Sequence, residues 1–436
     1  MFQGQKDITG KKNSRKVAVG YDLGRTFAQI SYCGLEETEP ETVSAVAGTE
    51  QYNIPVVLCK RSGVGQWYYG KEAIKFAKEE NGILVEDLLT LAERGEDVLV
   101  EGEAFDPAAL LTLFVKRSLS LLNIRIQLSQ IEAFMFTVEE LTPRMVDVLG
   151  KVAAGLSLKT EYICFQNHLE SFYAYTLHQS RELRKSNVMI FEYHTALKTL
   201  CLECNERTSP RVVVIEQRNY PEMERRIWNE EPEIRKKQMG ELDMLFADIA
   251  GRELKDRSVS TIFLLGDGFK ENWAKESLRL LCRNRRVFQG NNLYSKGACY
   301  GMMERLHPGE EWKEHVYLGD DKLKSNIGIR ALRRGEDSYY AILDAGINWY
   351  EASSDFDVIL ESGNTVDFVI TPLTGGKVTY RSLSLEGLPQ RPARTTRLNI
   401  HMEMTAVNQA AVTIEDMGFG EMFKSSGKAW TQTIIV

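Results

Sequence analysis

The sequence predicts an α/β domain followed by an antiparallel β domain. Over residues 17–305, apolar runs of strand length alternate with segments whose apolar residues recur at helical spacing, which indicates helices packed on sheets. From residue 326 onward, strand-like runs separated by turns rich in Gly, Asn, Asp and Ser dominate. A chain of 436 residues also exceeds the size of one ordinary core. The predicted organisation is a flexible tail (1–16), an α/β domain (17–310), a linker (311–325) and a β domain (326–436).

The composition indicates a folded globular protein, with 43% hydrophobic and 26% charged residues. The formal net charge of −7 disfavours nucleic acid as the main partner, because phosphate binding needs a basic surface. Apolar runs such as 261–265 have strand length and fall short of the roughly 18 residues of a membrane helix, so no membrane partner is expected. The polar, basic start of the chain lacks the apolar core of a signal peptide, and we expect a cytoplasmic protein.

Seven cysteines are scattered along the chain, which fits reduced thiols in the absence of an export signal. Cys201 and Cys204 have the spacing found in zinc and redox sites. They lie within the strand-like run 197–204, however, and no second pair follows. We therefore disfavour both chemistries at this position.

Residues 17–32 (VAVGYDLGRTFAQISY) predict a β-hairpin, with an apolar strand on each side of a glycine-containing turn. Asp22 offers a carboxylate, Gly24 a flexible backbone and Thr26 a hydroxyl. Backbone amides around such a glycine can approach a phosphate, and a nearby carboxylate can hold a cation or its water shell. Acidic turns with a glycine also join strands without any ligand, so the motif alone leaves both interpretations open.

Further local signals place helices and strands. Asp106-Pro107 and Thr142-Pro143 each combine an N-cap residue with a proline suited to the first helical position. Residues 187–203 predict a second β-hairpin, and 260–265 predict a strand that leads into a helix near Phe269. The predicted inward-facing residues of one strand in the β domain are Leu398, Ile400, Met402 and Met404.

Residues 17–32, 54–77, 136–156, 260–281, 291–303 and 381–420 follow one another in an order that resembles the seventy-kilodalton heat-shock chaperones of the actin/hexokinase-like ATPase superfamily. Residues 17–32 are similar to the first phosphate loop of that family, and 260–281 to its adenosine loop. Residues 381–420 resemble its peptide-binding β-sandwich. Residues 291–303 resemble a connecting helix whose small residues let two helices pack closely, namely Gly297, Ala298 and Gly301.

The resemblance implies an actin-like ATPase domain with ribonuclease H-like subdomains, followed by a β-sandwich domain that binds peptides. ATP or ADP and Mg²⁺ are the implied cofactors. The implied nucleotide-binding residues are Gly24, Arg25, Thr26, Gly266, Asp267, Gly268 and Phe269. The implied catalytic residues are Asp22, Glu192 and Glu170, and Asp22 and Glu192 would also hold the metal, Glu192 through water.

The second phosphate loop departs from the pattern of the family. The family has an aspartate followed by glycines, whereas this chain has Glu192-Tyr193-His194-Thr195. A Cβ at each of the last three positions disfavours positive φ and the close approach of a phosphate. The lysine expected near the γ-phosphate is missing from residues 81–97, where Leu88 and Leu89 occupy the corresponding region. His194 either contacts phosphate or is an ordinary turn residue.

Two further departures concern the β domain. Segment 316–326 lacks the leucine run that such linkers dock on the nucleotide domain. No helical lid follows the last strand, which reaches Val436, so lid-gated peptide capture is not expected.

The main hypothesis is a chaperone-like protein that binds adenine nucleotide with Mg²⁺, hydrolyses it slowly or not at all, and engages a protein or peptide through its β domain. Hydrolysis needs preorganised charge at the γ-phosphate, which the altered second loop lacks. One alternative is an interaction scaffold, a pseudo-ATPase that binds no nucleotide. The other is a small-molecule kinase of the same superfamily, which the β domain disfavours because such kinases have a second α/β lobe there. The oligomeric state stays open.

Overall fold

The computed structural model describes residues 16–46, 48–79, 82–160, 162–290, 292–333 and 335–436. Residues 1–15, which make up most of the predicted tail, lie outside the described residues. The chain is mixed α/β with several sheets, including an antiparallel-sheet region at its C-terminal end. It divides into two compact units: the N-terminal unit, Met1–Leu202 with Glu216–Trp312, and the C-terminal unit, Glu203–Ile215 with Lys313–Val436.

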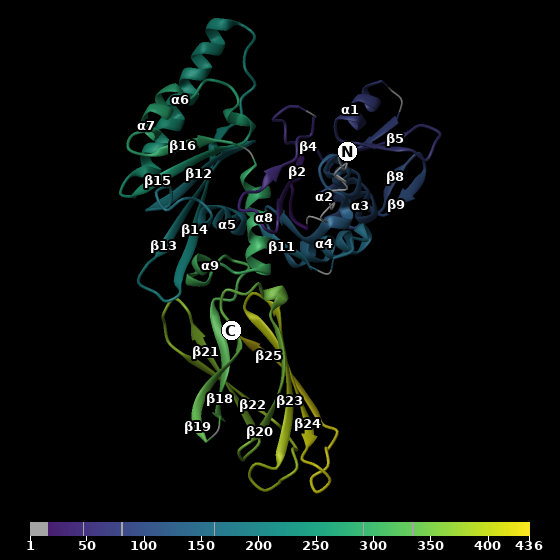
Figure 1. The fold of residues 1–436 in the computed structure, drawn as a ribbon, viewed down its shortest axis with the longest axis vertical. Coiled ribbons are helices and arrows are strands. Elements are labelled where there is room, and N and C mark those ends of the chain that lie inside the picture. Colours follow the sequence, from purple (N-terminus) through teal and green to yellow (C-terminus); the bar gives the residue numbers. More distant parts are fainter. Residues whose placement is uncertain (1–15, 47, 80–81, 161, 291, 334) are drawn as a thin grey trace, which may run out of the picture. The chain divides into compact units, whose positions relative to one another are not determined.

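The first sheet of the N-terminal unit is built around the hairpin predicted from residues 17–32 (Figure 1). β1 (Val17–Leu23) pairs antiparallel with β2 (Phe27–Gly34), which confirms that prediction. β10 (Ile131–Val138) and β11 (Tyr162–Asn167) extend the sheet beyond β1 as parallel strands. The short strands β3 (Glu41–Thr42) and β4 (Ile54–Pro55) pair with β2, so the order is β11-β10-β1-β2-β3.

The second sheet repeats this order. β12 (Asn187–Tyr193) and β13 (Ala196–Asn205) form the second predicted hairpin, which is confirmed. β15 (Val259–Leu265) and β16 (Arg286–Gln289) extend the sheet beyond β12 as parallel strands. With β14 (Arg211–Glu224) and β17 (His315–Tyr317), the order is β16-β15-β12-β13-β14-β17. In each sheet the first strand of an antiparallel hairpin has a parallel strand beside it on its other side, and a second parallel strand lies beyond that one. Both parallel strands come later in the chain than the hairpin.

Helices begin where the sequence provides caps. α3 (Pro107–Ser118) starts after Asp106, whose carboxylate accepts a hydrogen bond from the amide of Ala108 at 3.1 Å. α4 (Pro143–Leu156) starts after Thr142, whose hydroxyl accepts one from the amide of Met145 at 3.1 Å. Both predicted starts are confirmed, because an N-cap oxygen satisfies an amide that has no partner within the helix. The other long helices of this unit are α5 (His168–Leu177), α6 (Pro232–Leu254) and α8 (Leu293–Leu306).

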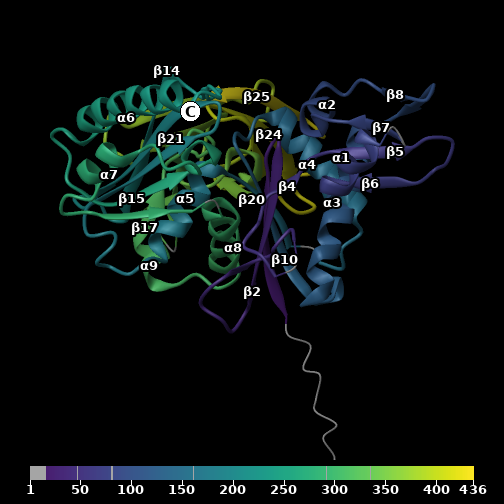
Figure 2. The same ribbon diagram turned by 90° about the horizontal axis from the view of Figure 1, so that it is seen from above.

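Helices α5 and α8 join the two sheets. α5 follows β11 of the first sheet, yet its Tyr175 ring contacts Phe263 of β15 in the second sheet at 5.6 Å. α8 follows β16 of the second sheet, yet its Ala298 shares a buried cluster with Ala18 of β1 in the first. Figure 2 shows α8 beside β2 and β10. Each sheet is therefore covered on one face by the helix that leaves the other sheet.

The contact between α5 and α8 depends on small residues. A Cβ on Gly297 of α8 would lie 2.0 Å from the carbonyl oxygen of Ser171 on α5, and one on Gly301 would lie 2.6 Å from Oε1 of Gln166. The Cβ on Gly297 would meet the backbone of α5, so this position accepts only glycine unless the helices separate, whereas at Gly301 the end of the Gln166 side chain on β11 would have to move. The predicted close helix packing is confirmed at Gly297, whereas Gly301 lies close to β11.

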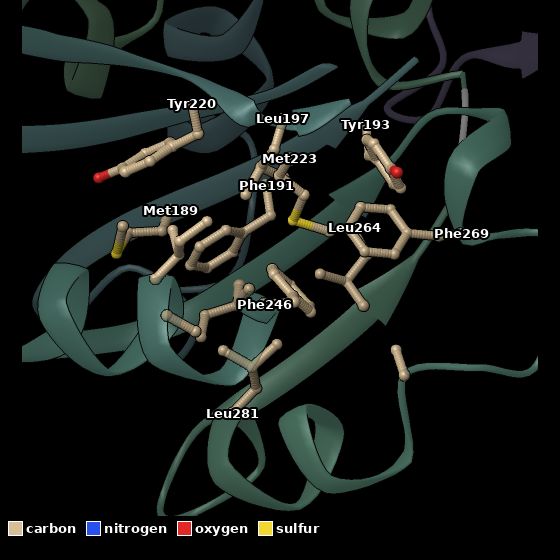
Figure 3. Packing of buried hydrophobic residues seen from close by; sticks show 14 of the residues in the cluster. Met189, Phe191, Tyr193, Leu197, Tyr220, Met223, Phe246, Leu264, Phe269 and Leu281 are labelled. Atoms are coloured by element: carbon tan, nitrogen blue, oxygen red, sulfur yellow. The ribbon is translucent and has the colours of Figure 1, made fainter. Parts of the chain in front are cut away.

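An aromatic core lies between the second sheet and α6 (Figure 3). Phe191 of β12 meets Phe246 of α6 edge-on, with ring centroids 5.3 Å apart. Tyr193, Phe269 and Trp273 continue the cluster around Phe246, and all of them are buried. Burial of each such ring stabilises the fold by about 1.5–3 kcal/mol. The core therefore fixes the residues that follow Glu192 and those that follow β15.

A smaller α/β segment lies between β4 and α3. It contains one sheet with the order β6-β5-β7 and one two-stranded hairpin. Its elements are β5 (Leu58–Arg61), β6 (Trp67–Tyr69), α1 (Gly70–Lys78), β7 (Gly82–Val85), α2 (Leu88–Arg94), β8 (Val98–Val100) and β9 (Glu103–Phe105).

Among its described residues, the C-terminal unit contains two four-stranded antiparallel sheets, β19-β18-β21-β22 and β20-β23-β24-β25. One hydrophobic core draws on both, for example Ile327 and Phe368 from the first sheet with Ile400 and Val412 from the second. The alternation predicted for β23 is confirmed, because Leu398, Ile400, Met402 and Met404 are all buried. The strands are β18 (Ser325–Arg333), β19 (Glu336–Leu343), β20 (Ser353–Leu360), β21 (Thr365–Pro372), β22 (Thr379–Ser384), β23 (Thr396–Ala406), β24 (Gln409–Gly418) and β25 (Ala429–Ile435).

Two local expectations about this region differ from the structure. Strand β18 was not predicted, because Gly328 interrupts its apolar pattern; a Cβ there would lie 2.4 Å from the Tyr339 ring, so the glycine allows a close approach within the sheet. The predicted linker 311–325 contains regular structure, namely most of α9 (Glu310–Glu314) and β17. The pairing of β17 with β14 supplies backbone hydrogen bonds that the local sequence does not reveal.

The prediction that a helix begins near Phe269 is wrong. A short 3₁₀ turn covers Asp267–Phe269, and α7 (Lys275–Leu281) begins only at Lys275. Phe269 and Trp273 are buried in the aromatic core, and the Trp273 indole donates a hydrogen bond to the carbonyl of Gly268 at 2.8 Å. Packing of these two rings therefore decides the path of the chain at this point.

By length and composition, one helical stretch among the described residues, Pro107–Ile124, could cross a membrane. Half of it is buried inside the structure, and core helices of soluble proteins pass the same test. Leu110, Leu111, Phe114 and Val115 on this stretch are buried, which favours a core helix.

Candidate functional site

A cavity of about 640 Å³ in the N-terminal unit brings most of the predicted site residues together. The carboxyl ends of β1, β10, β12 and β15 line it, with the first residues of α5 and α8. Ligands of α/β proteins usually bind at the carboxyl ends of sheet strands. The predicted residues that line this cavity are Asp22, Gly24, Arg25, Thr26, Glu192, Gly266 and Asp267.

The β1–β2 turn is short. The amide of Gly24 donates a hydrogen bond to the carbonyl of Phe27 at 3.0 Å, which closes the turn directly after β1. Thr26 is exposed at the turn. The guanidinium of Arg25 lies 2.9 Å from the Glu93 carboxylate and donates to the Thr90 hydroxyl at 2.7 Å, both on α2. The charge of Arg25 is therefore already partly balanced by the protein.

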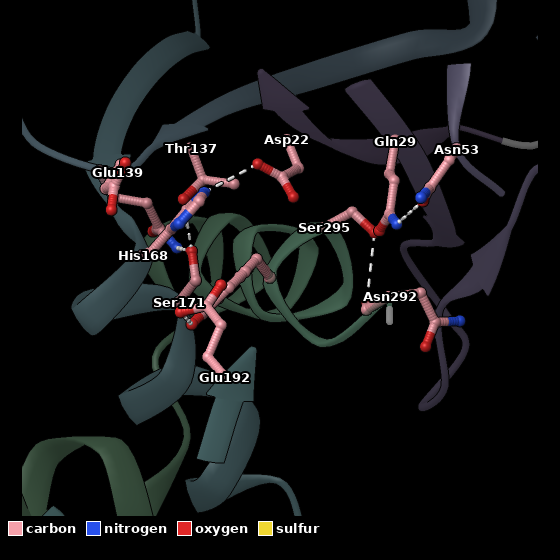
Figure 4. Close-up of polar contacts among 12 residues, drawn as sticks. Asp22, Gln29, Asn53, Thr137, Glu139, His168, Ser171, Glu192, Asn292 and Ser295 are labelled. Carbon is pink, nitrogen blue, oxygen red and sulfur yellow. Dashed lines mark hydrogen bonds and ion pairs between the residues drawn. The ribbon is translucent and has the colours of Figure 1, made fainter. Parts of the chain in front are cut away.

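Asp22 contacts a histidine, His168, that is not among the predicted site residues. His168, the first residue of α5, places its Nε2 2.8 Å from Oδ1 of Asp22 (Figure 4). Asn167 caps this helix by accepting a hydrogen bond from the amide of Glu170 at 2.8 Å, and this fixes the helix start. The His168 ring stacks on Tyr294 of α8, with centroids 4.0 Å apart. The helix pair α5–α8 thus positions the partner of Asp22.

Glu192 is buried, and both of its carboxylate oxygens have partners. The Tyr294 hydroxyl donates to Oε2 at 3.0 Å, and Nζ of Lys198 lies 2.9 Å from the same oxygen. Nε2 of His194 lies 3.4 Å from Oε1. Burial alone would raise the pKa of Glu192, but the hydrogen bond with His194 and the charges of Lys198 and His168 outweigh it and hold this pKa well below its usual value. Glu192 is therefore a carboxylate at neutral pH.

Lys198 bridges two carboxylates. Its Nζ lies 2.9 Å from Oε2 of Glu192 and 3.1 Å from Oε1 of Glu139, which follows β10. Burial would lower the pKa of the Lys198 ammonium, but the charges of Glu192 and Glu139 raise it above its usual value. The Lys198 charge in turn lowers the pKa of Glu139. Lys198 also supplies the cavity with a lysine from β13, whereas Leu89 lines it from the segment in which the resemblance expected one.

The β12–β13 turn carries side chains at the positions where the family has glycines. Tyr193 points away from the cavity into the aromatic core, where its hydroxyl donates to the carbonyl of Glu224 at 2.9 Å (Figure 3). His194 and Thr195 are exposed at the turn and line the cavity. Three of the positions at which the family has glycines therefore carry one core residue and two cavity residues.

The loop after β15 places only two of its four predicted nucleotide-binding residues at the cavity. Gly266 has a φ of +100°, and a Cβ there would lie 2.4 Å from the carbonyl oxygen of Tyr193. A Cβ on Gly268 would lie 2.3 Å from the Tyr193 ring. Both glycines therefore allow close packing against Tyr193. Gly266 and Asp267 line the cavity, whereas Gly268 and Phe269 do not, so the last two do not fit the nucleotide-binding role expected for them.

Glu170 also lies apart from the cavity. Its carboxylate is buried and lies 3.8 Å from Arg305 of α8. The residue of this helix start that reaches the cavity is His168, two positions earlier. The signal for it was the N-cap Asn167, because side chains in the first turn of a helix lie near the end of the preceding strand.

The expected Mg²⁺ site does not fit the residues present. Among the described residues, no group of three or more His, Cys, Asp and Glu side chains could hold a metal ion. Glu192 is already bound by an ammonium, a hydroxyl and an imidazole, and Asp22 by His168. Cys201 and Cys204 are three residues apart on β13, so their side chains point to opposite faces of the sheet and cannot chelate one ion.

Two protein-family models match this chain, one over most of the α/β part and one over the C-terminal region. The chain belongs to the family described as Family of unknown function (DUF5716) C-terminal, which matches residues 39–320. Residues 322–436 match the Domain of unknown function (DUF8552). A search of curated proteins found no match. The β1–β2 hairpin with Asp22 precedes the first match, whereas the β12–β13 hairpin, α5 and α8 lie within it.

Proposed function

We propose that the N-terminal unit is a nucleotide-binding domain of the actin-like ATPase superfamily, related to the seventy-kilodalton heat-shock chaperones, and that it binds an adenine nucleotide without hydrolysing it. The observation that carries the proposal is the repeated topology. Two hairpins at equivalent places in two sheets end at one cavity and bring Asp22 and Glu192 to it. The preference for adenine rests on the resemblance alone.

Several cavity residues would contact the anionic part of such a ligand. The β1–β2 turn offers the exposed Thr26 hydroxyl at the end of a sheet, where backbone amides can approach a phosphate. His168 and His194 line the same cavity, and ring N–H groups of histidine can donate to phosphate oxygens. Mg²⁺ is not part of the proposal, because the residues present do not fit it.

Loss of hydrolysis follows from the partners of the two carboxylates. Phosphoryl transfer needs charge placed at the transferred group and a residue that orients the attacking water. Asp22 is bound by His168, and Glu192 by Lys198, Tyr294 and His194. The three protein groups around Glu192 occupy acceptor sites that an attacking water would need, and His168 holds Oδ1 of Asp22, which argues for a pseudo-ATPase.

We further propose that the C-terminal unit engages a protein or peptide in the cytoplasm. Its two antiparallel sheets end in the strands β19, β22, β20 and β25. Edge strands present unpaired backbone groups to which an extended peptide can add as a further strand. An array of short peptides of varied sequence, probed with the whole chain, would test this role.

A second candidate function is an interaction scaffold that binds no nucleotide. It is favoured by the ion pairs of the cavity, in which Arg25 pairs with Glu93, Lys198 with Glu192 and Glu139, and Asp267 with Lys270 at 2.5 Å. Pairing of these carboxylates within the protein lets the cavity stay stable without a ligand.

Calorimetric titration with ATP, ADP and AMP distinguishes the two candidates. A Kd of about 10 μM would also stabilise the protein against unfolding by about 2.7 kcal/mol at about 1 mM nucleotide. Thr26→Trp should abolish binding by filling the cavity, and Thr374→Trp, the same change at an exposed turn of the C-terminal unit, should not. No release of the γ-phosphate is expected. Absence of both heat and stabilisation in the wild type would favour the scaffold.

A further inference from the structure

The misfit between Mg²⁺ and the cavity has a specific cause in Lys198. Its ammonium lies between the carboxylates of Glu192 and Glu139, at 2.9 Å and 3.1 Å. Two carboxylates converging on one point are the usual protein contribution to a site for a hard divalent cation. In this chain a side-chain cation takes that point.

We propose that Lys198 is the built-in counter-cation of this cavity: it replaces a divalent metal between Glu139 and Glu192, and the cavity binds its ligand without metal. The first half of the proposal concerns the protein alone. The second half rests on the nucleotide-binding function proposed above.

The register of the β12–β13 hairpin builds this arrangement into the fold. Glu192 and Lys198 are directly opposite each other in the antiparallel pair, so their side chains leave the same face of the sheet. The lysine therefore reaches Glu192 without any rearrangement of the backbone. At the equivalent place in the first hairpin, the residue opposite Asp22 is the uncharged Gln29.

Burial makes exchange of the lysine for a metal ion unfavourable. The side chains of Glu192 and Lys198 are 7% and 16% exposed, so both charges are largely removed from water. A buried charge must be paired, and the ammonium satisfies this need for Glu192. The Tyr294 hydroxyl and His194 complete the shell of Glu192 at 3.0 Å and 3.4 Å. A metal ion would have to displace these partners.

The charge of the lining explains why a cation is needed there. Besides Lys198, Arg25 is the other lysine or arginine among the described lining residues, and it is held by Glu93. Without Lys198 an anionic ligand would face the acidic lining residues with Arg25 as the one lysine or arginine among the described lining residues, so Lys198 reduces the repulsion. The acidic lining residues are Asp22, Glu93, Glu139, Glu140, Glu192 and Asp267.

Manganese binding measured by electron paramagnetic resonance, with no nucleotide present, tests the first half. Mn²⁺ accepts the same oxygen ligands as Mg²⁺. Wild type should bind no Mn²⁺ that depends on Glu192. Lys198→Ala should gain about one Mn²⁺ per chain, because the two carboxylates then lack a cation. Lys198→Arg, which keeps the charge, should behave as the wild type, and Lys198→Ala with Glu192→Gln should lose the gained ion.

Two results would overturn the proposal. One is Mn²⁺ binding by the wild type that Glu192→Gln removes, which is informative even if Lys198→Ala fails to fold. The other is a folded Lys198→Ala, judged by circular dichroism, that gains no Mn²⁺.

Nucleotide titration in the presence of EDTA tests the second half. Wild-type affinity should be the same with Mg²⁺ and with EDTA, whereas Lys198→Ala should bind at least about tenfold more tightly with Mg²⁺ than without. Wild-type affinity that falls with EDTA would overturn this half. If no nucleotide binds at all while the manganese results hold, the function proposed above fails and the role of Lys198 stands.

Discussion

The two sheets of the N-terminal unit contain the same hairpin, but they hold its carboxylate in different ways. Asp22 in the first hairpin is bound by His168, which comes from α5, and faces the uncharged Gln29 across the strand pair. Glu192 in the second hairpin is bound by Lys198 of the same hairpin. One carboxylate thus depends on tertiary contacts, whereas the other is neutralised by its own strand partner. A repeated topology therefore does not imply a repeated chemistry.

The residues after each carboxylate differ in the cluster that they join and in the size of the next residue. Leu23 follows Asp22 and lines the cavity. The next residue is the small Gly24. Tyr193 follows Glu192 and belongs to the aromatic core. Leu23 and Tyr193 are both buried, so a change at either position loses a core contact, and only Tyr193 belongs to the aromatic cluster that includes Phe246 of α6.

The largest effect is expected from Tyr193. Tyr193→Ala should destabilise the protein by about 3–5 kcal/mol, because it empties a site between Phe269, Trp273 and Phe246. His194→Gly with Thr195→Gly, two exposed turn positions beside it, should cost less than about 2 kcal/mol. Urea unfolding at neutral pH measures both. Equal costs would show that the second turn is not tied to the core.

The next effect concerns the helices that join the sheets. Gly297→Ala should cost about 2–3 kcal/mol, because the added Cβ meets the carbonyl of Ser171 at 2.0 Å. Gly240→Ala is the matched control within α6, where nothing lies within 4 Å, and it should stabilise the protein by about 0.5–1 kcal/mol. A tolerated Gly297→Ala would mean that α5 and α8 separate easily, and a change in the Asp22–His168 contact would then be expected.

The carboxylates can be compared directly. Glu192→Gln should cost about 1–3 kcal/mol, because Lys198 is then left with Glu139 as its one described carboxylate partner. Asp22→Asn should cost about 1 kcal/mol or less, because an amide oxygen still accepts a hydrogen bond from His168. Denaturant midpoints of the two variants at the same pH provide the measurement. A larger cost for Asp22→Asn would reverse the comparison.

The smallest effect is the pH dependence of His194. The hydrogen bond with Glu192 raises the pKa of His194, so its contribution to stability is complete below the unfolded pKa of about 6.5 and is lost as the pH rises through the higher folded pKa. The side chain is 53% exposed, so the contribution should stay below about 1 kcal/mol. Thermal unfolding of wild type and His194→Gln across this range should converge at high pH. A difference that grows with pH would contradict the assignment.

Much of the local structure could be predicted from sequence. Apolar strands on each side of a short turn placed both hairpins, with a glycine only in the first turn, and Asp106-Pro107 and Thr142-Pro143 placed the starts of α3 and α4. Alternation placed the buried face of β23. These features depend on residues close together in the chain, so a short window contains their physical cause.

The site could be predicted only in part. The Asp22 turn, Glu192 and Gly266 line the cavity as expected, because each lies at the carboxyl end of a strand. Gly268 and Phe269 were assigned to the ligand, but the packing of Phe269 against Phe246 and Tyr193 removes them from the cavity. The signal for Lys198 was available, since a glutamate and a lysine at matching distances from a hairpin turn face each other across it.

The sequence by itself determined the succession of strands and helices, the two hairpins and the change from mixed α/β to antiparallel structure. Only the tertiary structure decided that His168 rather than Glu170 reaches the cavity, and that Lys198 joins Glu139 to Glu192. The physical reason is distance along the chain. Asp22 and His168 are brought together by the pairing of β10 with both β1 and β11, and no local propensity encodes a contact between segments so far apart.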